Sequence, residues 1–100
     1  MAAQYYLVRA RMDGRYLTAH PQVESDPDHP SPTFLLLFQE HYDALSYLNT
    51  HASGLAEQFA VESISNSQVA GLLQRWGFNG VGMVRDPLVP RVEFLTRIAS

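Results

Sequence analysis

The sequence predicts a single α+β domain, with a mixed, mostly antiparallel sheet and two helices packed on one of its faces. Two segments have the apolar spacing of amphipathic helices, and the other apolar runs are short, as in strands. Their order is ββ-β-α-β-α-β-β, an arrangement that favours a sheet with helices on one side. With 46% apolar and 17% charged residues, a chain of 100 residues is typical of one globular core. We therefore treat residues 1–100 as one domain.

A β-hairpin is predicted over residues 5–20. Two strand-like runs flank Asp13-Gly14, a dipeptide that suits the positive φ angles of a type I′ turn. This turn would place Arg11 opposite Tyr16 and Arg9 opposite Thr18. Because strand side chains alternate, the hairpin gains a core face and a mixed face. The core face carries Tyr6, Val8, Ala10, Met12, Leu17 and Ala19, and the mixed face carries Tyr5, Leu7, Arg9, Arg11, Tyr16 and His20.

Residues 21–32 are predicted to form an exposed acidic loop rich in proline, because proline lacks the backbone donor that regular structure needs. The acidic residues do not have the spacing of a calcium-binding loop. The β-α-β-α-β-β part, residues 33–95, follows. It begins with the apolar run Phe34–Phe38, which is typical of a strand covered on both faces.

Two helices and three more strands are predicted after this run. The first helix spans residues 40–52, and a strand covers residues 59–64. Ser65 or Asn66 can cap the second helix, and Gln68 lies three residues after Ser65, the spacing of a capping box. The core stripe of that helix consists of Val69, Leu72, Leu73 and Trp76. Gly77 ends the helix in the left-handed conformation, and strands are expected over residues 81–85 and 91–95.

Parts of this second region resemble a known family. The run Phe34–Phe38, the helical segments at residues 43–48 and 69–73, the run Gly77–Val84 and the turn Asp86-Pro87 resemble the SseB-type N-terminal domain. They are also similar to small uncharacterised cyanobacterial and chloroplast α+β domains. The resemblance covers about two-thirds of the chain. It implies a role in secretion or regulation without catalytic residues, and its cyanobacterial side suggests assistance to a photosynthetic or carbon-fixing complex.

No catalytic, metal-binding or cofactor-binding motif is recognised. The chain has no cysteine, which excludes thiol chemistry and disulfides. The glycines of residues 77–82 follow a helix and enter a strand, the reverse of a phosphate-binding loop. His41 and His51 would lie about 15 Å apart along one helix, too far to share a metal ion. We therefore predict a protein that is not an enzyme and needs no metal and no cofactor.

The charged residues point instead to protein recognition. All seven basic residues are arginine, which suits interfacial contacts better than lysine does. Two helices can cover only one side of a sheet, so Leu35 and Leu37 would extend the mixed hairpin face as an exposed apolar patch. A homodimer would cover this patch, and the proline loop folding back or an obligatory different protein could do the same. The open sheet face or an edge strand could also capture the extended tail of another protein by strand addition. The predicted partner-binding residues are Tyr5, Leu7, Arg9, Arg11, Tyr16, His20, Leu35 and Leu37.

The function predicted on this basis is a non-catalytic adaptor, assembly factor or chaperone-like protein. One alternative is a small-molecule sensor, which would need a polar-lined cavity between helices and sheet. Another is a single-stranded nucleic-acid binder, which the net charge of −3 disfavours. No apolar run approaches the roughly 18 residues of a membrane span, and the first residues do not look like a signal peptide. A cytoplasmic location is therefore expected.

Overall fold

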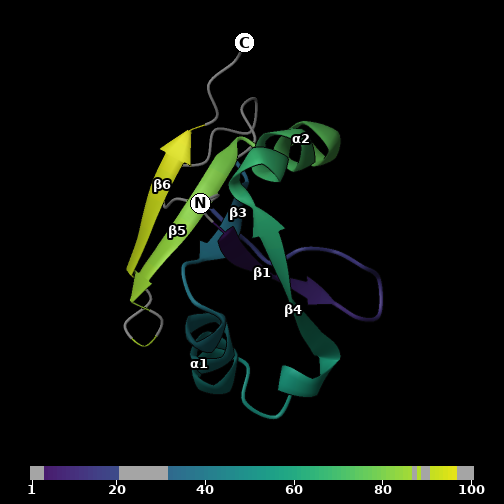
Figure 1. Ribbon diagram of the computed structural model, residues 1–100. Helices are drawn as coiled ribbons and strands as arrows, with labels where there is room; N and C mark the ends of the chain where they lie inside the picture. The colour runs from purple at the N-terminus through teal and green to yellow at the C-terminus, as the bar shows by residue number, and fades with distance from the viewer. Residues whose placement is uncertain (1–3, 21–31, 87, 89–90, 97–100) are drawn as a thin grey trace.

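The computed structural model describes residues 4–20, 32–86, 88 and 91–96, so nearly all of the predicted acidic loop lies outside the described residues. The elements are a six-stranded sheet, two helices and a short 3₁₀ helix at Ala56–Gln58 (Figure 1). They are β1 (Gln4–Ala10), β2 (Thr18–Ala19), β3 (Phe34–Phe38), α1 (His41–His51), β4 (Phe59–Ser65), α2 (Asn66–Trp76), β5 (Gly80–Asp86) and β6 (Arg91–Thr96).

The sheet has the strand order β4-β1-β3-β5-β6, and the short strand β2 also pairs with β3. β3 and β5 are parallel, whereas all the other pairings are antiparallel. The predicted α+β class, with a mixed and mostly antiparallel sheet, is confirmed. β4 and β6 are the outer strands of this order, so each has one backbone edge that no other described strand pairs with.

The two helices lie on opposite faces of the sheet, so the prediction that both pack on one face is wrong. Leu35 and Leu37 pack in the same cluster as Leu73 of α2. Their neighbours Leu36 and Phe38 pack on the other side with Ala44 and Leu48 of α1. Figure 1 shows the helices well apart, with the strands between them.

The order of the strands explains this arrangement. The connection from β3 through α1 to β4 passes β1 in one direction, and the connection from β4 through α2 to β5 passes back over β1 and β3. Both connections join parallel strands, and such crossovers are almost always right-handed. Two right-handed crossovers that run in opposite directions place their helices on opposite faces.

The strand β3 is therefore the centre of the core, as its apolar run predicts. Its five side chains are all buried, and the exposed fractions of Leu35 and Leu37 are 0% and 1%. Leu7 is 2% exposed. The predicted exposed patch containing Leu7, Leu35 and Leu37 does not exist, because α2 covers this face.

The hairpin forms, but its turn differs from the prediction. Arg9 lies opposite Tyr16, and the Ala10 amide donates to the Arg15 carbonyl at 2.8 Å. Gly14 alone takes a positive φ, of 72°, whereas a type I′ turn needs positive φ at both central residues. Asp13 instead accepts a hydrogen bond from the Arg15 amide at 3.0 Å, which stabilises a longer turn. The pairing shifts by two residues, so Val8, Leu17 and Ala19 keep their predicted core face. Met12, also predicted on the core face, lies in the longer turn and is 92% exposed, so that prediction is wrong.

The predicted ends of α2 are confirmed. The Gln68 side-chain oxygen accepts a hydrogen bond from the Ser65 amide at 3.1 Å and completes a capping box. Gly77 has φ 72° and ψ 27°, and the Phe78 amide donates to the Leu73 carbonyl at 2.9 Å. Because Ser65 is both the last residue of β4 and the cap of α2, no linker separates the strand from the helix.

Candidate functional site

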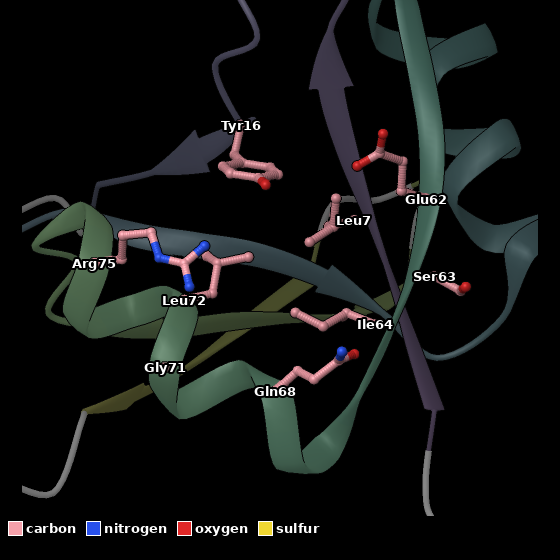
Figure 2. A pocket seen from close by; sticks show the side chains of 9 residues that line it. All are labelled: Leu7, Tyr16, Glu62, Ser63, Ile64, Gln68, Gly71, Leu72 and Arg75. Atoms are coloured by element: carbon pink, nitrogen blue, oxygen red, sulfur yellow. The ribbon is translucent and has the colours of Figure 1, made fainter.

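A hollow of about 390 Å³ lies between α2 and the strands β1 and β4 (Figure 2). The helix leaves the end of β4 at an angle, so the two elements enclose a wedge that widens away from Ser65. The apolar side chains of the wedge are Leu7, Ile64 and Leu72. Its polar side chains are Tyr16, Glu62, Ser63, Gln68 and Arg75.

The local sequence explains which side chains enter the hollow. Alternation along β4 turns Glu62 and Ile64 to the same face as Leu7, the face that α2 covers. Along α2, residues three and four apart share one flank, and this spacing groups Gln68, Leu72 and Arg75. Gly71 lies on the same flank and contributes no side chain.

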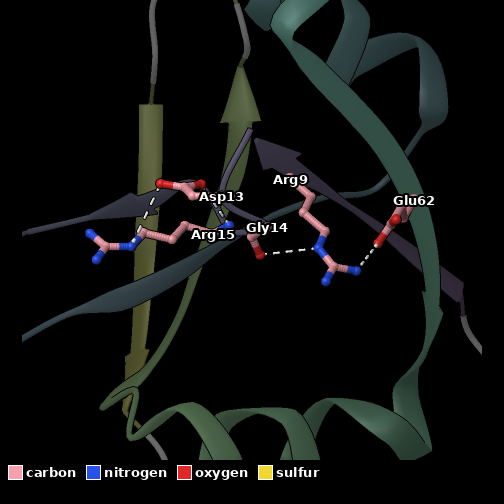
Figure 3. Close-up of polar contacts among 5 residues, drawn as sticks. All are labelled: Arg9, Asp13, Gly14, Arg15 and Glu62. Atoms are coloured by element: carbon pink, nitrogen blue, oxygen red, sulfur yellow. Dashed lines mark hydrogen bonds and ion pairs between the residues drawn. The ribbon is translucent and has the colours of Figure 1, made fainter. Parts of the chain in front are cut away.

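Arg9 connects the hairpin turn to the rim of the hollow (Figure 3). Its Nε donates a hydrogen bond to the Gly14 carbonyl at 3.0 Å, and its Nη1 lies 3.8 Å from Oε1 of Glu62. Its guanidinium carbon lies 5.4 Å from the centre of the Tyr16 ring, in a cation–π arrangement. An exposed ion pair of this length contributes at most about 1 kcal/mol to stability. Arg9 thus contacts the turn, Tyr16 and Glu62 at the same time.

A row of aromatic rings continues from the rim of the hollow. The rings of Tyr16 and Trp76 meet edge to face at 5.1 Å between centroids, and Trp76 stacks on Phe78 at 6.1 Å. Trp76 is 42% exposed, so the prediction that it belongs to the core is wrong. Its ring lies on the outside of the buried Phe78, at the very end of α2, instead of beneath the helix. Leu72, also predicted as core, is half-buried.

The predicted partner-binding residues are divided among three places. Leu7, Arg9 and Tyr16 meet at the hollow, while Leu35 and Leu37 lie in the core with Tyr5 half-buried against them. The remaining two are exposed and bonded elsewhere: Arg11 Nε to the Phe59 carbonyl at 3.3 Å, and His20 Nδ1 to the Pro32 carbonyl at 3.1 Å.

Sequence reasoning missed Glu62, Gln68 and Arg75. The spacing of Gln68 and Arg75 beside the apolar stripe of α2 is visible in the sequence. The neighbourhood of β4 and β1, which brings Glu62 to the same place, is not visible, because it depends on the long-range strand order.

The outer edge of β4 is a second feature of this region. The backbone amide and carbonyl groups of the even-numbered residues of β1 point toward the returning part of the hairpin. The Leu17 amide donates to the Val8 carbonyl, and the Ala10 amide donates to the Arg15 carbonyl. Odd-numbered residues of β1 therefore bond to β4, and their partners there are even-numbered. This pattern turns the amide and carbonyl groups of Val61 and Ser63 outward. Within the described part of the chain these groups have no hydrogen-bond partner.

Burial raises the pKa of Tyr47, which packs on the α1 face, away from the hollow. Among the described residues, histidine, aspartate and glutamate nowhere gather in a group of three or more that could hold a metal ion. In the same part of the chain, neither helix is long and apolar enough to cross a membrane.

Comparison with known proteins gives no relative from which a function could be transferred. No protein-family model matches the sequence, and no curated protein and no solved structure gives a significant match. The resemblance to the SseB-type domain stays a prediction.

Proposed function

We propose that this protein is a non-catalytic interaction module, an adaptor or assembly factor, that captures an extended segment of another protein by strand addition at β4. The observation that carries the proposal is the outer edge of β4, where Val61 and Ser63 direct outward amide and carbonyl groups that pair with no residue the structure describes. An extended chain laid along this edge would satisfy them with ladder hydrogen bonds.

The surroundings of β4 favour recognition more than those of the other outer strand, β6. Glu62 and Ser63 are exposed beside the hollow, so alternate side chains of an added strand would lie next to the hollow. Arginine and aromatic side chains, which are enriched at interfaces, stand at its rim as Arg9, Tyr16 and Trp76. Backbone pairing at the edge would supply affinity, and these side chains would supply selectivity.

The proposed site replaces the surface expected from the sequence. Leu35 and Leu37 cannot form the surface of a homodimer, because both side chains are buried. Self-association stays a prediction, because a free β4 edge can also pair with β4 of a second copy. Light scattering at increasing protein concentration would measure it.

Selection from a displayed library of random linear peptides tests the proposed function. We expect the selection to enrich peptides that bind the wild-type protein. These peptides should bind Ser63→Ala about equally well, because this variant keeps the outward backbone amide of residue 63. Ser63→Pro removes the outward amide without removing a bond of the sheet, and we expect it to weaken the selected peptides at least tenfold.

The matched variants separate a lost edge from a lost fold. Proline is tolerated on outer strands, so the circular dichroism spectrum of Ser63→Pro should stay close to that of Ser63→Ala. Peptides that bind the folded Ser63→Pro protein as tightly as wild type would contradict strand addition at β4. Failure to enrich any peptide would contradict peptide capture altogether.

A further inference from the structure

The hollow beside α2 carries opposite charges on its two arms. Figure 2 shows Glu62 of β4 and Arg75 of α2 extending toward the hollow from opposite sides. The apolar side chains of Leu7, Ile64 and Leu72 lie between them. A ligand that reaches both charged groups therefore has to cross an apolar surface.

Both charged groups are available to a ligand. Arg75 makes no ion pair or hydrogen bond with any residue that the structure describes. The contact of Glu62 with Arg9 is long, at 3.8 Å, and both side chains are more than two-fifths exposed, at 44% and 42%. A carboxylate has about four acceptor sites, so Glu62 can hold a ligand cation while Arg9 stays beside it.

We propose that this hollow binds a small zwitterion whose carboxylate and ammonium groups are separated by an apolar chain. The carboxylate pairs with the guanidinium of Arg75, and the ammonium group pairs with Glu62. The chain between them covers Leu7, Ile64 and Leu72. The volume of about 390 Å³ lies at the lower end of the range for small-molecule sites, roughly 300–1,000 Å³.

The charge arrangement also sets the selectivity of the hollow. A ligand with only a carboxylate would face Glu62 without a cation to offer, and a ligand with only an amine would face Arg75 without an anion. Each single-charge ligand leaves one protein charge without its match, and such mismatches reduce affinity. The inference goes beyond peptide capture, because it requires no strand at the β4 edge.

Titration of the full chain with ω-aminohexanoate, followed by two-dimensional amide NMR, tests the proposal. The two reference ligands are hexanoate and hexylamine, which have the same chain but one charge each. We expect the zwitterion to bind about fivefold more tightly than either, the factor that one exposed ion pair supplies. The shifted amides should include those of Ser63, Gln68 and Gly71, which line the hollow.

Charge-neutralising variants then assign the two ends of the ligand. Arg75→Gln should remove the preference over hexylamine, and Glu62→Gln should remove the preference over hexanoate. Arg85→Gln is the control, because this arginine bonds to Glu93 at 2.9 Å between β5 and β6, outside the hollow. The peptide test changes Ser63 at the β4 edge, whereas this test changes Glu62 and Arg75, so the two tests can fail separately.

Three results would overturn the assignment. They are equal affinity for the three ligands, a preference that survives both Arg75→Gln and Glu62→Gln, and amide shifts confined to residues outside the hollow. Thermal midpoints of Arg75→Gln, Glu62→Gln and Arg85→Gln within a few degrees of wild type would show that these results concern binding, since exposed substitutions rarely alter the fold.

Discussion

The two faces of the sheet are covered in different ways. On one face, α1 presents the small Ala44 and the adjacent Leu48, which are 0% and 3% exposed. On the other face, Leu73, which is 5% exposed, is the only buried residue of α2. The linker through residues 52–58 leaves α1 free to settle on its face, whereas α2 starts directly at the end of β4 and diverges from it. A helix without a linker can thus leave room for a binding site beside it.

The largest expected difference concerns leucines on these two faces. Leu48→Ala should lower the free energy of unfolding by about 2–5 kcal/mol, because it opens a cavity in a closed part of the core. Leu72→Ala should cost less, about 1–2 kcal/mol, since its side chain is only partly buried beside the hollow. Urea denaturation of both variants measures the contrast. Equal losses would mean that the two faces are packed equally well.

A smaller loss is expected at Gly82, on the α1 face. A Cβ atom there would lie 3.0 Å from Cγ1 of Val92 and 3.3 Å from Cδ2 of Leu36, so Gly82→Ala should cost about 1–3 kcal/mol through overpacking. Combining it with Val92→Ala makes room for the new methyl group. The double variant should therefore lose less stability than the sum of the two single variants. A strictly additive double variant would show that this part of the face is not tightly packed.

The same comparison shows what the sequence could predict. The helices and their ends at Ser65 and Gly77 follow from local patterns, and both are confirmed. The apolar run of β3 is typical of a strand covered on both faces, but the expectation of two helices on one face led to the wrong prediction that Leu35 and Leu37 are exposed. The face of the sheet on which each helix packs does not follow from local patterns, because it depends on the strand order. β1 lies between β4 and β3, so the two crossovers run in opposite directions.

The candidate site was only partly predictable for the same reason. Arg9 and Tyr16 were predicted on one hairpin face but opposite other residues. They keep that face and become opposite each other because the register shifts by two residues. Glu62 and Arg75 come from two other elements. Only the placement of β4 beside β1, and of α2 over both, brings them to the same hollow.

The smallest expected effect has the opposite sign and concerns Gly71, in the exposed flank of α2. Nothing lies within 4 Å of a Cβ atom built there, so alanine fits without strain. Gly71→Ala should raise stability by about 0.5–1 kcal/mol, because glycine is a poor residue inside a helix. The added methyl group would enter the wall of the hollow and should weaken binding of ω-aminohexanoate. Ala70, exposed on the same helix but outside the hollow, offers the control: Ala70→Ser should leave this binding unchanged. A Gly71→Ala protein that is more stable and binds as well as wild type would show that this flank of α2 does not form the site.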